Sequence, residues 1–229
     1  MSLAALAVNF FVALFALIDP VGNVPIYAAA TSGASSAQRR RLAAYLSLFI
    51  VAFLTFFFFT GLALLQFFGI SIAAFRIAGG VLLFLLGLEM AREDFIAAFA
   101  DAEAGDPSHE VSEYARKRFE RLIVPFGMPL LIGPGVISAV IIQASEVKKF
   151  GVPGMLAGLG VILAVGVATF VSFALTGPIS RVLGKIGMAI VVRVLGLILC
   201  ALAVQFIIAG LGEATHGFIT KSVATPYAH

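Results

Sequence analysis

Six long apolar stretches, separated by short polar segments, constrain the fold of this chain more than any other feature. A helix of roughly 20 apolar residues is long enough to cross a hydrocarbon core of about 30 Å. Of the 229 residues, 61% are hydrophobic and 12% are charged, whereas roughly 25% of the residues of a soluble domain are charged. The sequence therefore predicts an all-α, polytopic membrane protein. Its six predicted transmembrane segments are residues 3–32, 42–66, 69–90, 121–146, 151–176 and 186–211.

Polar segments divide this single membrane domain, residues 1–229, into two halves of three segments each. The first half covers residues 1–90, and the second covers residues 121–211. Between them lies a polar stretch, residues 91–120, with eight acidic residues. Because high charge with low hydrophobicity disfavours a packed core, we expect a solvated, partly disordered loop there. Residues 212–229 form a short polar tail, which we expect to be frayed.

Basic residues are distributed unevenly between the polar segments. Ten lie in or beside the first, third and fifth connections, which are residues 33–41, 91–120 and 177–185, and three lie in the other polar segments. Because Lys and Arg are enriched in cytoplasmic loops, we expect these three connections to be cytoplasmic and both termini to lie outside. The expected location is the cell (inner) membrane.

The sequence offers few of the side chains that metal sites and membrane enzymes need. Its one cysteine, Cys200, excludes an internal disulfide, and its three histidines lie in polar segments without forming a cluster. An intramembrane aspartyl protease needs two carboxylates in the membrane, and only Asp19 lies deep in an apolar segment. No phosphate-binding loop of the type GxxxxGK[ST] occurs. We therefore expect no enzyme activity, no cofactor, no metal and no nucleic-acid partner.

The two halves of the chain resemble each other. Leu17–Pro20 matches Leu131–Pro134 at an offset of 114 residues, and Arg76–Gly79 matches Arg193–Gly196 at an offset of 117. Since each half has an odd number of segments, the second half would enter the membrane from the opposite side. This pattern predicts two inverted three-helix repeats, related by a pseudo-two-fold axis in the membrane plane, as in many transporters.

Residues 19–25 interrupt the first apolar segment with residue types that a membrane helix disfavours. Two prolines in this stretch lack an amide donor and clash with the preceding turn, and the glycine between them permits unusual backbone angles. We expect residues 19–23 to unwind and a new half-helix to begin near Val24. Either Asn23 or Asp19 would be the N-cap of that half-helix, with a proline in its first turn.

The fourth segment has a similar interruption at Gly133–Gly135, where Pro134 should begin a second half-helix. Each restart exposes amide N–H groups and the positive end of a helix dipole, which suit a carboxylate. Irregular backbone in a membrane must be buried in protein or line a polar cavity. We therefore predict a small polar pocket near the membrane centre, at the two breaks. Its predicted substrate-binding residues are Asp19, Pro20, Gly22, Asn23, Gly133, Pro134, Gly135 and Ser138.

Three charged side chains lie well inside the apolar segments, away from the segment ends. Asp19 is the most deeply placed acid, and a charge at the membrane centre costs about 2.5–3.5 kcal/mol on insertion scales, so we interpret it as functional. Arg76 and Arg193 occupy equivalent positions in the two repeats. They are candidates to support the pocket by offsetting Asp19 or a substrate carboxylate. The alternative for both is a long side chain that reaches the membrane surface, or a purely structural contact.

The two interrupted stretches, Asp19–Pro25 and Met128–Gly135, resemble the two signature stretches of the MarC family. The similarity also includes the polar central loop and the Arg-containing starts of the third and sixth segments. This resemblance implies a LysE-like membrane fold with inverted repeats. It also implies transport of small neutral amino acids such as glycine and alanine.

These observations lead to one functional hypothesis and several alternatives. The hypothesis is a secondary transporter that takes up or exchanges small neutral amino acids by alternating access around the pocket at the broken first and fourth helices. The alternatives are an exporter of another small metabolite and a channel, both on the same scaffold. Coupling to H⁺ or Na⁺, the direction of transport and the oligomeric state stay open.

Overall fold

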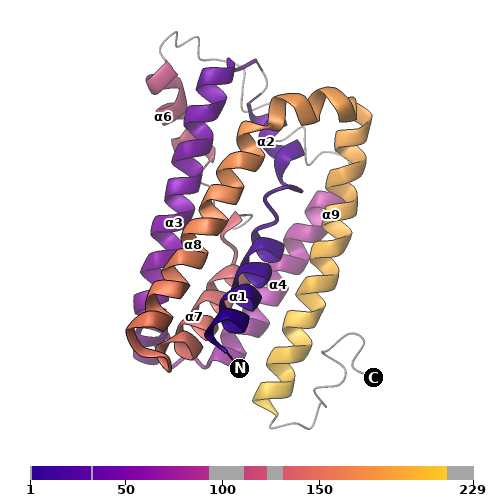
Figure 1. The fold of residues 1–229 in the computed structure, drawn as a ribbon. Helices are drawn as coiled ribbons and strands as arrows, with labels where there is room; N and C mark the ends of the chain where they lie inside the picture. The colour runs from indigo at the N-terminus through magenta and orange to yellow at the C-terminus, as the bar shows by residue number, and fades with distance from the viewer. Residues whose placement is uncertain (1, 32, 93–110, 123–130, 216–229) are drawn as a thin grey trace.

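The computed structural model describes residues 2–31, 33–92, 111–122 and 131–215, and within these ranges the regular structure is entirely helical. This confirms the predicted all-α class. The element order is α1 (Leu3–Ile18), α2 (Val24–Ala30), α3 (Ser36–Phe67), α4 (Ile72–Ala91), α6 (Val111–Leu122), α7 (Pro134–Lys148), α8 (Gly151–Ala174) and α9 (Thr176–Ala214). Figure 1 shows the long helices side by side, as expected of a membrane bundle.

Four helices are long and apolar enough to cross a membrane by length and composition: α3, α4, α8 and the Ala189–Ala214 part of α9. They correspond to the second, third, fifth and sixth predicted segments. The first segment is instead split into α1 and α2, and α7 contributes the described helical part of the fourth. The expected number of six spans therefore stays a prediction, whereas the two interruptions lie where the sequence places them.

Local signals in the sequence explain where the long helices begin and end. The hydroxyl of Ser35 accepts the amide of Gln38, whose side chain accepts the amide of Ser35, so a capping box begins α3. The hydroxyl of Ser71 accepts the amide of Ala74 at the start of α4. Between these helices Gly69 has a φ of 66°, which favours glycine. Gly69 therefore forms a tight turn between the second and third predicted segments.

The prediction of a loop over residues 91–120 is wrong at its end, because α6 extends from Val111 to Leu122. The helix is supported by an ion pair of 2.9 Å between Glu113 and Lys117, one helical turn apart. Its Phe119 packs edge-on against two aromatic rings of α3. Charge alone predicts a solvated segment, and this amphipathic face was missed. The expectation for residues 93–110 lies outside the described residues.

The connection predicted at residues 177–185 is also helical, since α9 begins at Thr176. One residue, Gly184, departs from helical geometry with φ 61° and ψ −178°. Its freedom to adopt a positive φ lets the helix turn sharply there, and Figure 1 shows the start of α9 lying across one end of the bundle before the rest runs down its side. The predicted tail is corrected as well, because α9 continues to Ala214.

The polypeptide enters and leaves the bundle at the same end. Figure 1 shows Leu3 and the end of α9 at this end, while the α2–α3 and α8–α9 connections lie at the other. The basic cluster Arg39–Arg41 in the first turns of α3 is therefore opposite Leu3. This arrangement agrees with the alternation on which the orientation argument rests. Which end faces the cytoplasm stays a prediction.

Helices α4 and α9 pack with their backbones in close contact. A Cβ added to Gly87 would lie 2.7 Å from the Gly196 carbonyl oxygen, and a Cβ on Gly196 would lie 2.6 Å from the Gly87 oxygen. Toward the other end, a Cβ on Gly210 would lie 2.9 Å from the oxygen of Ala73. Since earlier residues of α4 meet later residues of α9, the pair is antiparallel. Glycines at membrane helix interfaces allow this approach.

We expect Gly87→Ala to lower the free energy of unfolding by about 1–3 kcal/mol, because the new methyl group overlaps the backbone of α9. The matched control is Gly160→Ala in α8, where an added Cβ meets no atom within 4 Å. That variant should be neutral, or up to about 1 kcal/mol more stable from helix propensity. Thermal unfolding in detergent measures both, and equal melting temperatures for the two variants would contradict the close packing of α4 and α9.

Candidate functional site

The first break begins where Asp19 takes the left-handed conformation, with φ 44° and ψ 62°. Its backbone N–H donates to the carbonyl of Phe15 at 2.9 Å and closes the last turn of α1. This is an αL helix end, and aspartate is one of the few residues besides glycine that adopt it readily. Pro20 follows directly and cannot continue the helix. The predicted unwinding over residues 19–23 is confirmed.

The side chain of Asn23 links the two sides of this break through hydrogen bonds. It is 4% exposed, and its Nδ2 donates to the carbonyl oxygens of Ile18 at 2.9 Å and Asp19 at 3.1 Å. The half-helix α2 begins at Val24, as predicted. Asn23 is the N-cap residue of α2, which is one of the two predicted alternatives, but its side chain makes no capping bond to α2. The amide instead satisfies carbonyls that the end of α1 leaves without helical partners.

The Asp19 carboxylate folds over its own turn. Its Oδ1 accepts the backbone N–H of Gly22 at 3.1 Å, which is an Asx-type turn. A Cβ on Gly22 would overlap both this carboxylate and Leu195 of α9, so a larger residue there would have to displace these two side chains. The carboxylate is half-buried. Part of the role of Asp19 is therefore structural, and the backbone bond occupies only one of its two oxygens.

The half-helix α2 is fixed at the far side of the break by Tyr27. Its buried ring stacks on Phe173 of α8 with centroids 4.4 Å apart. Its hydroxyl donates to the carbonyl oxygen of Arg39 at 2.6 Å. These contacts join α2 to the helices on either side, so the break is held between two fixed ends.

The second break ends at Pro134, the first residue of α7, as predicted. Gly133 is the N-cap in an extended conformation and has no side chain to accept an amide. The first free amides of α7 therefore have no helical partner. A Cβ on Gly135 would lie 2.6 Å from the side chain of Leu83, so α4 packs tightly here. One turn later Ser138 is 1% exposed, and its hydroxyl has no hydrogen-bond partner in the described part of the chain.

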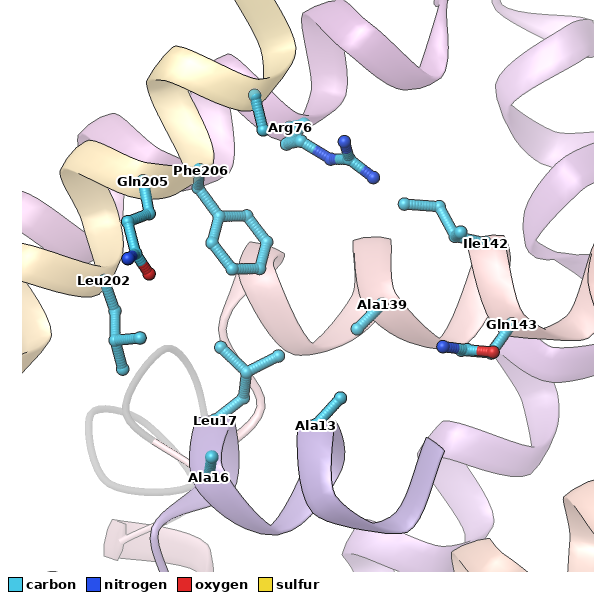
Figure 2. A pocket seen from close by; sticks show the side chains of 11 residues that line it. Ala13, Ala16, Leu17, Arg76, Ala139, Ile142, Gln143, Leu202, Gln205 and Phe206 are labelled. Carbon is cyan, nitrogen blue, oxygen red and sulfur yellow. The ribbon is translucent and has the colours of Figure 1, made fainter. Parts of the chain in front are cut away.

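A cavity of about 360 Å³ lies beside the two breaks, between α1, α4, α7 and α9 (Figure 2). This size is typical of a small-molecule pocket. Its surface is mainly small and apolar, with one guanidinium and two carboxamides. The lining residues are Ala13, Ala16, Leu17, Arg76, Ala139, Ile142, Gln143, Leu202, Gln205, Phe206 and Ala209.

The residues that line the cavity are close neighbours in sequence of the predicted pocket residues. Leu17 lies two residues before Asp19, and Ala139 directly follows Ser138. Among the predicted site residues whose side chains the structure describes, Arg76 is the one that lines this cavity. The breaks therefore border the space, while the sides of the half-helices line it.

The equivalence of the two arginines in sequence does not extend to their surroundings. Arg193 is exposed on α9 and does not line the cavity. Arg76, by contrast, has a side chain that is 17% exposed and forms an ion pair of 2.6 Å with Glu213 in the last turn of α9. Arg76 therefore faces the cavity as one hypothesis expected, but its observed partner is Glu213 rather than Asp19.

Sequence reasoning missed the two glutamines of the cavity. Gln143 and Gln205 lie within the fourth and sixth apolar segments, where a polar residue is as unusual as Asp19 is in the first. The Oε1 of Gln143 is buried and has no hydrogen-bond partner among the described residues. An unpaired buried carboxamide oxygen is costly, so Gln143 is a residue of the cavity wall whose hydrogen-bonding capacity the described structure does not fill.

We expect Asn23→Leu to lower the free energy of unfolding by about 1–3 kcal/mol, because the buried Ile18 carbonyl loses its side-chain donor and the Asp19 carbonyl keeps only its backbone donor. Gln66→Leu, an amide-to-leucine change at an exposed position of α3, is the matched control. It should leave the thermal unfolding midpoint in detergent close to the wild-type value. A stable Asn23→Leu variant would contradict the linking role of this side chain.

Residues 4–215 match the MarC family of integral membrane proteins. A UPF0056 membrane protein of Methanocaldococcus jannaschii is 33% identical, with 89% of this chain and 95% of the relative aligned. YhcE of Escherichia coli is 34% identical over 89% and 90% of the two chains, and YvbG of Bacillus subtilis is 33% identical over 89% and 93%. No solved structure matches. The chain belongs to the MarC family of integral membrane proteins.

Proposed function

We propose that this protein is a secondary transporter that takes up or exchanges small neutral amino acids such as glycine and alanine. The observation that carries the proposal is the pair of interrupted membrane helices that border one cavity with a guanidinium in its wall. Broken helices at matching places in two halves of a chain are typical of secondary transporters, and their substrates bind at the breaks.

The chemistry of the breaks suits a zwitterion. The N-terminus of α7 offers backbone amides and the positive end of a helix dipole, which favour a carboxylate. Asp19 keeps one oxygen outside its turn and offers a negative charge for an ammonium group. Tight packing at Gly22 and Gly135 leaves little space beside the backbone. We therefore expect a preference for solutes with small side chains.

Inverted repeats are part of this proposal, and the α4–α9 pair supports them. An offset of 117 residues relates Leu83 to Cys200, and these residues lie near the middle of the antiparallel pair, where the Cys200 thiol contacts the Phe84 carbonyl at 3.7 Å. A pseudo-two-fold axis between α4 and α9 at this level would exchange the two halves. Rocking of one repeat against the other would then expose the cavity to each side in turn.

The test uses Asp19→Asn, which removes the charge and keeps an oxygen for the Gly22 amide. In proteoliposomes we expect wild-type protein to show saturable uptake or exchange of radiolabelled glycine. We expect the variant to lose about tenfold or more of this rate, since a favourable charge contact of about 1.4 kcal/mol is worth tenfold. Its melting temperature should stay near the wild-type value, because the turn is preserved.

Glu146→Gln is the matched control, since it removes a carboxylate from the exposed Glu146–Lys149 pair. Its uptake should equal that of the wild type. Wild-type uptake by Asp19→Asn would reduce Asp19 to a turn residue. A wild-type protein that moves no small neutral amino acid would contradict the proposal. Flux that rises without saturating would indicate a channel, and a different labelled solute that competes with alanine would indicate another substrate.

A further inference from the structure

The two side chains of the Arg76–Glu213 ion pair differ in burial and in their position relative to the cavity. Arg76 extends from the first turns of α4, its side chain is 17% exposed, and it forms part of the cavity wall. Glu213 lies at the end of α9, its side chain is 44% exposed, and it is not among the residues that line the cavity. The guanidinium is therefore held in the cavity, whereas the carboxylate approaches it from the rim.

A guanidinium in this position needs a negative partner. Arginine stays charged at any physiological pH, and a charge that is partly removed from water is costly unless it is paired. In the described structure the carboxylate of Glu213 supplies that partner at 2.6 Å. Any solute carboxylate that enters the cavity would meet the same guanidinium and offer the same two oxygens in the same geometry.

Gln143 is a second polar residue of the cavity wall. Its Oε1 is buried without a hydrogen-bond partner among the described residues. Figure 2 shows Arg76 extending from α4 toward Ile142 of α7, while the carboxamide of Gln143 points from α7 into the space over Ala13. Apart from the polar side chains, the cavity wall is formed largely by small and aliphatic side chains. The carboxylate of a small zwitterion is complementary to the guanidinium of Arg76 in this part of the cavity.

We propose that Glu213 is an internal substitute for the carboxylate of the transported solute on Arg76. When a zwitterionic solute enters the cavity, its carboxylate takes the guanidinium and Glu213 moves away into water. When the solute leaves, Glu213 returns and neutralises Arg76. The exchange keeps the guanidinium paired in both states, and it selects for solutes that carry a carboxylate. This inference rests on the proposed function and assigns the specificity of its cavity to Arg76 and Glu213.

The test measures binding of radiolabelled glycine to the full-length protein in detergent and compares half-saturating concentrations. Glu213→Gln frees Arg76 from its competitor, so the half-saturating concentration should fall roughly two- to fivefold, the range set by a partly exposed ion pair. Arg76→Gln should raise it about tenfold or more, as expected for a lost charge-assisted contact. In the double variant the gain from Glu213→Gln should vanish, because the guanidinium it frees is absent. Glu146→Gln, in an exposed pair that is not part of the cavity lining, should change nothing.

Glycinamide, which lacks the carboxylate, is the second probe. It should compete weakly with glycine for the wild type, and Glu213→Gln should not improve its competition. An unchanged or higher half-saturating concentration for glycine in folded Glu213→Gln would overturn the exchange and leave the proposed function intact. The same holds if the double variant keeps the full gain. If the wild type binds no small neutral amino acid, the proposed function fails and this inference fails with it.

Discussion

The need to pair every backbone amide and carbonyl inside a membrane is the constraint on which the rest of this structure depends. A continuous helix meets that need internally, but α1 stops at Ile18 and α2 begins only at Val24. The side chain of Asn23 resolves the interruption by donating to two carbonyls at the end of α1. The Asp19 carboxylate accepts the Gly22 amide in the same turn. A break that is satisfied in this way is stable without being helical, so it can border a cavity.

The second break meets the same constraint differently. Gly133 has no side chain to cap α7, and Ser138 is buried there with an unpaired hydroxyl in the described structure. Both breaks retain hydrogen-bonding capacity, since the Oδ1 of Asn23 is also buried without a partner in the described structure. The cavity beside them adds the guanidinium of Arg76 and the carboxamide of Gln143. The two halves of the chain resemble each other in sequence. The polar groups that they contribute to the breaks and to the cavity nevertheless differ.

Residue types with strong backbone preferences made much of this predictable. Prolines and glycines located the start of α2 and the start of α7 to the residue. Side-chain partners were not predictable, because they depend on packing between distant segments. Asn23 holds the N-cap position of α2, but its side chain donates to the end of α1, and Arg76 pairs with Glu213, 137 residues away. Gln143 and Gln205 carried the same signal as Asp19, namely a polar group in an apolar segment, and were overlooked.

The most direct test of the account is thermal unfolding of the wild-type protein in detergent with each of the common amino acids added separately. A ligand that binds only the folded state at 100 times its dissociation constant stabilises it by about 2.7 kcal/mol. The account predicts higher melting temperatures with glycine, alanine and serine, and no shift with large or charged amino acids. Stabilisation by bulky apolar compounds alone, or by none of the amino acids, would contradict a cavity built for small zwitterions.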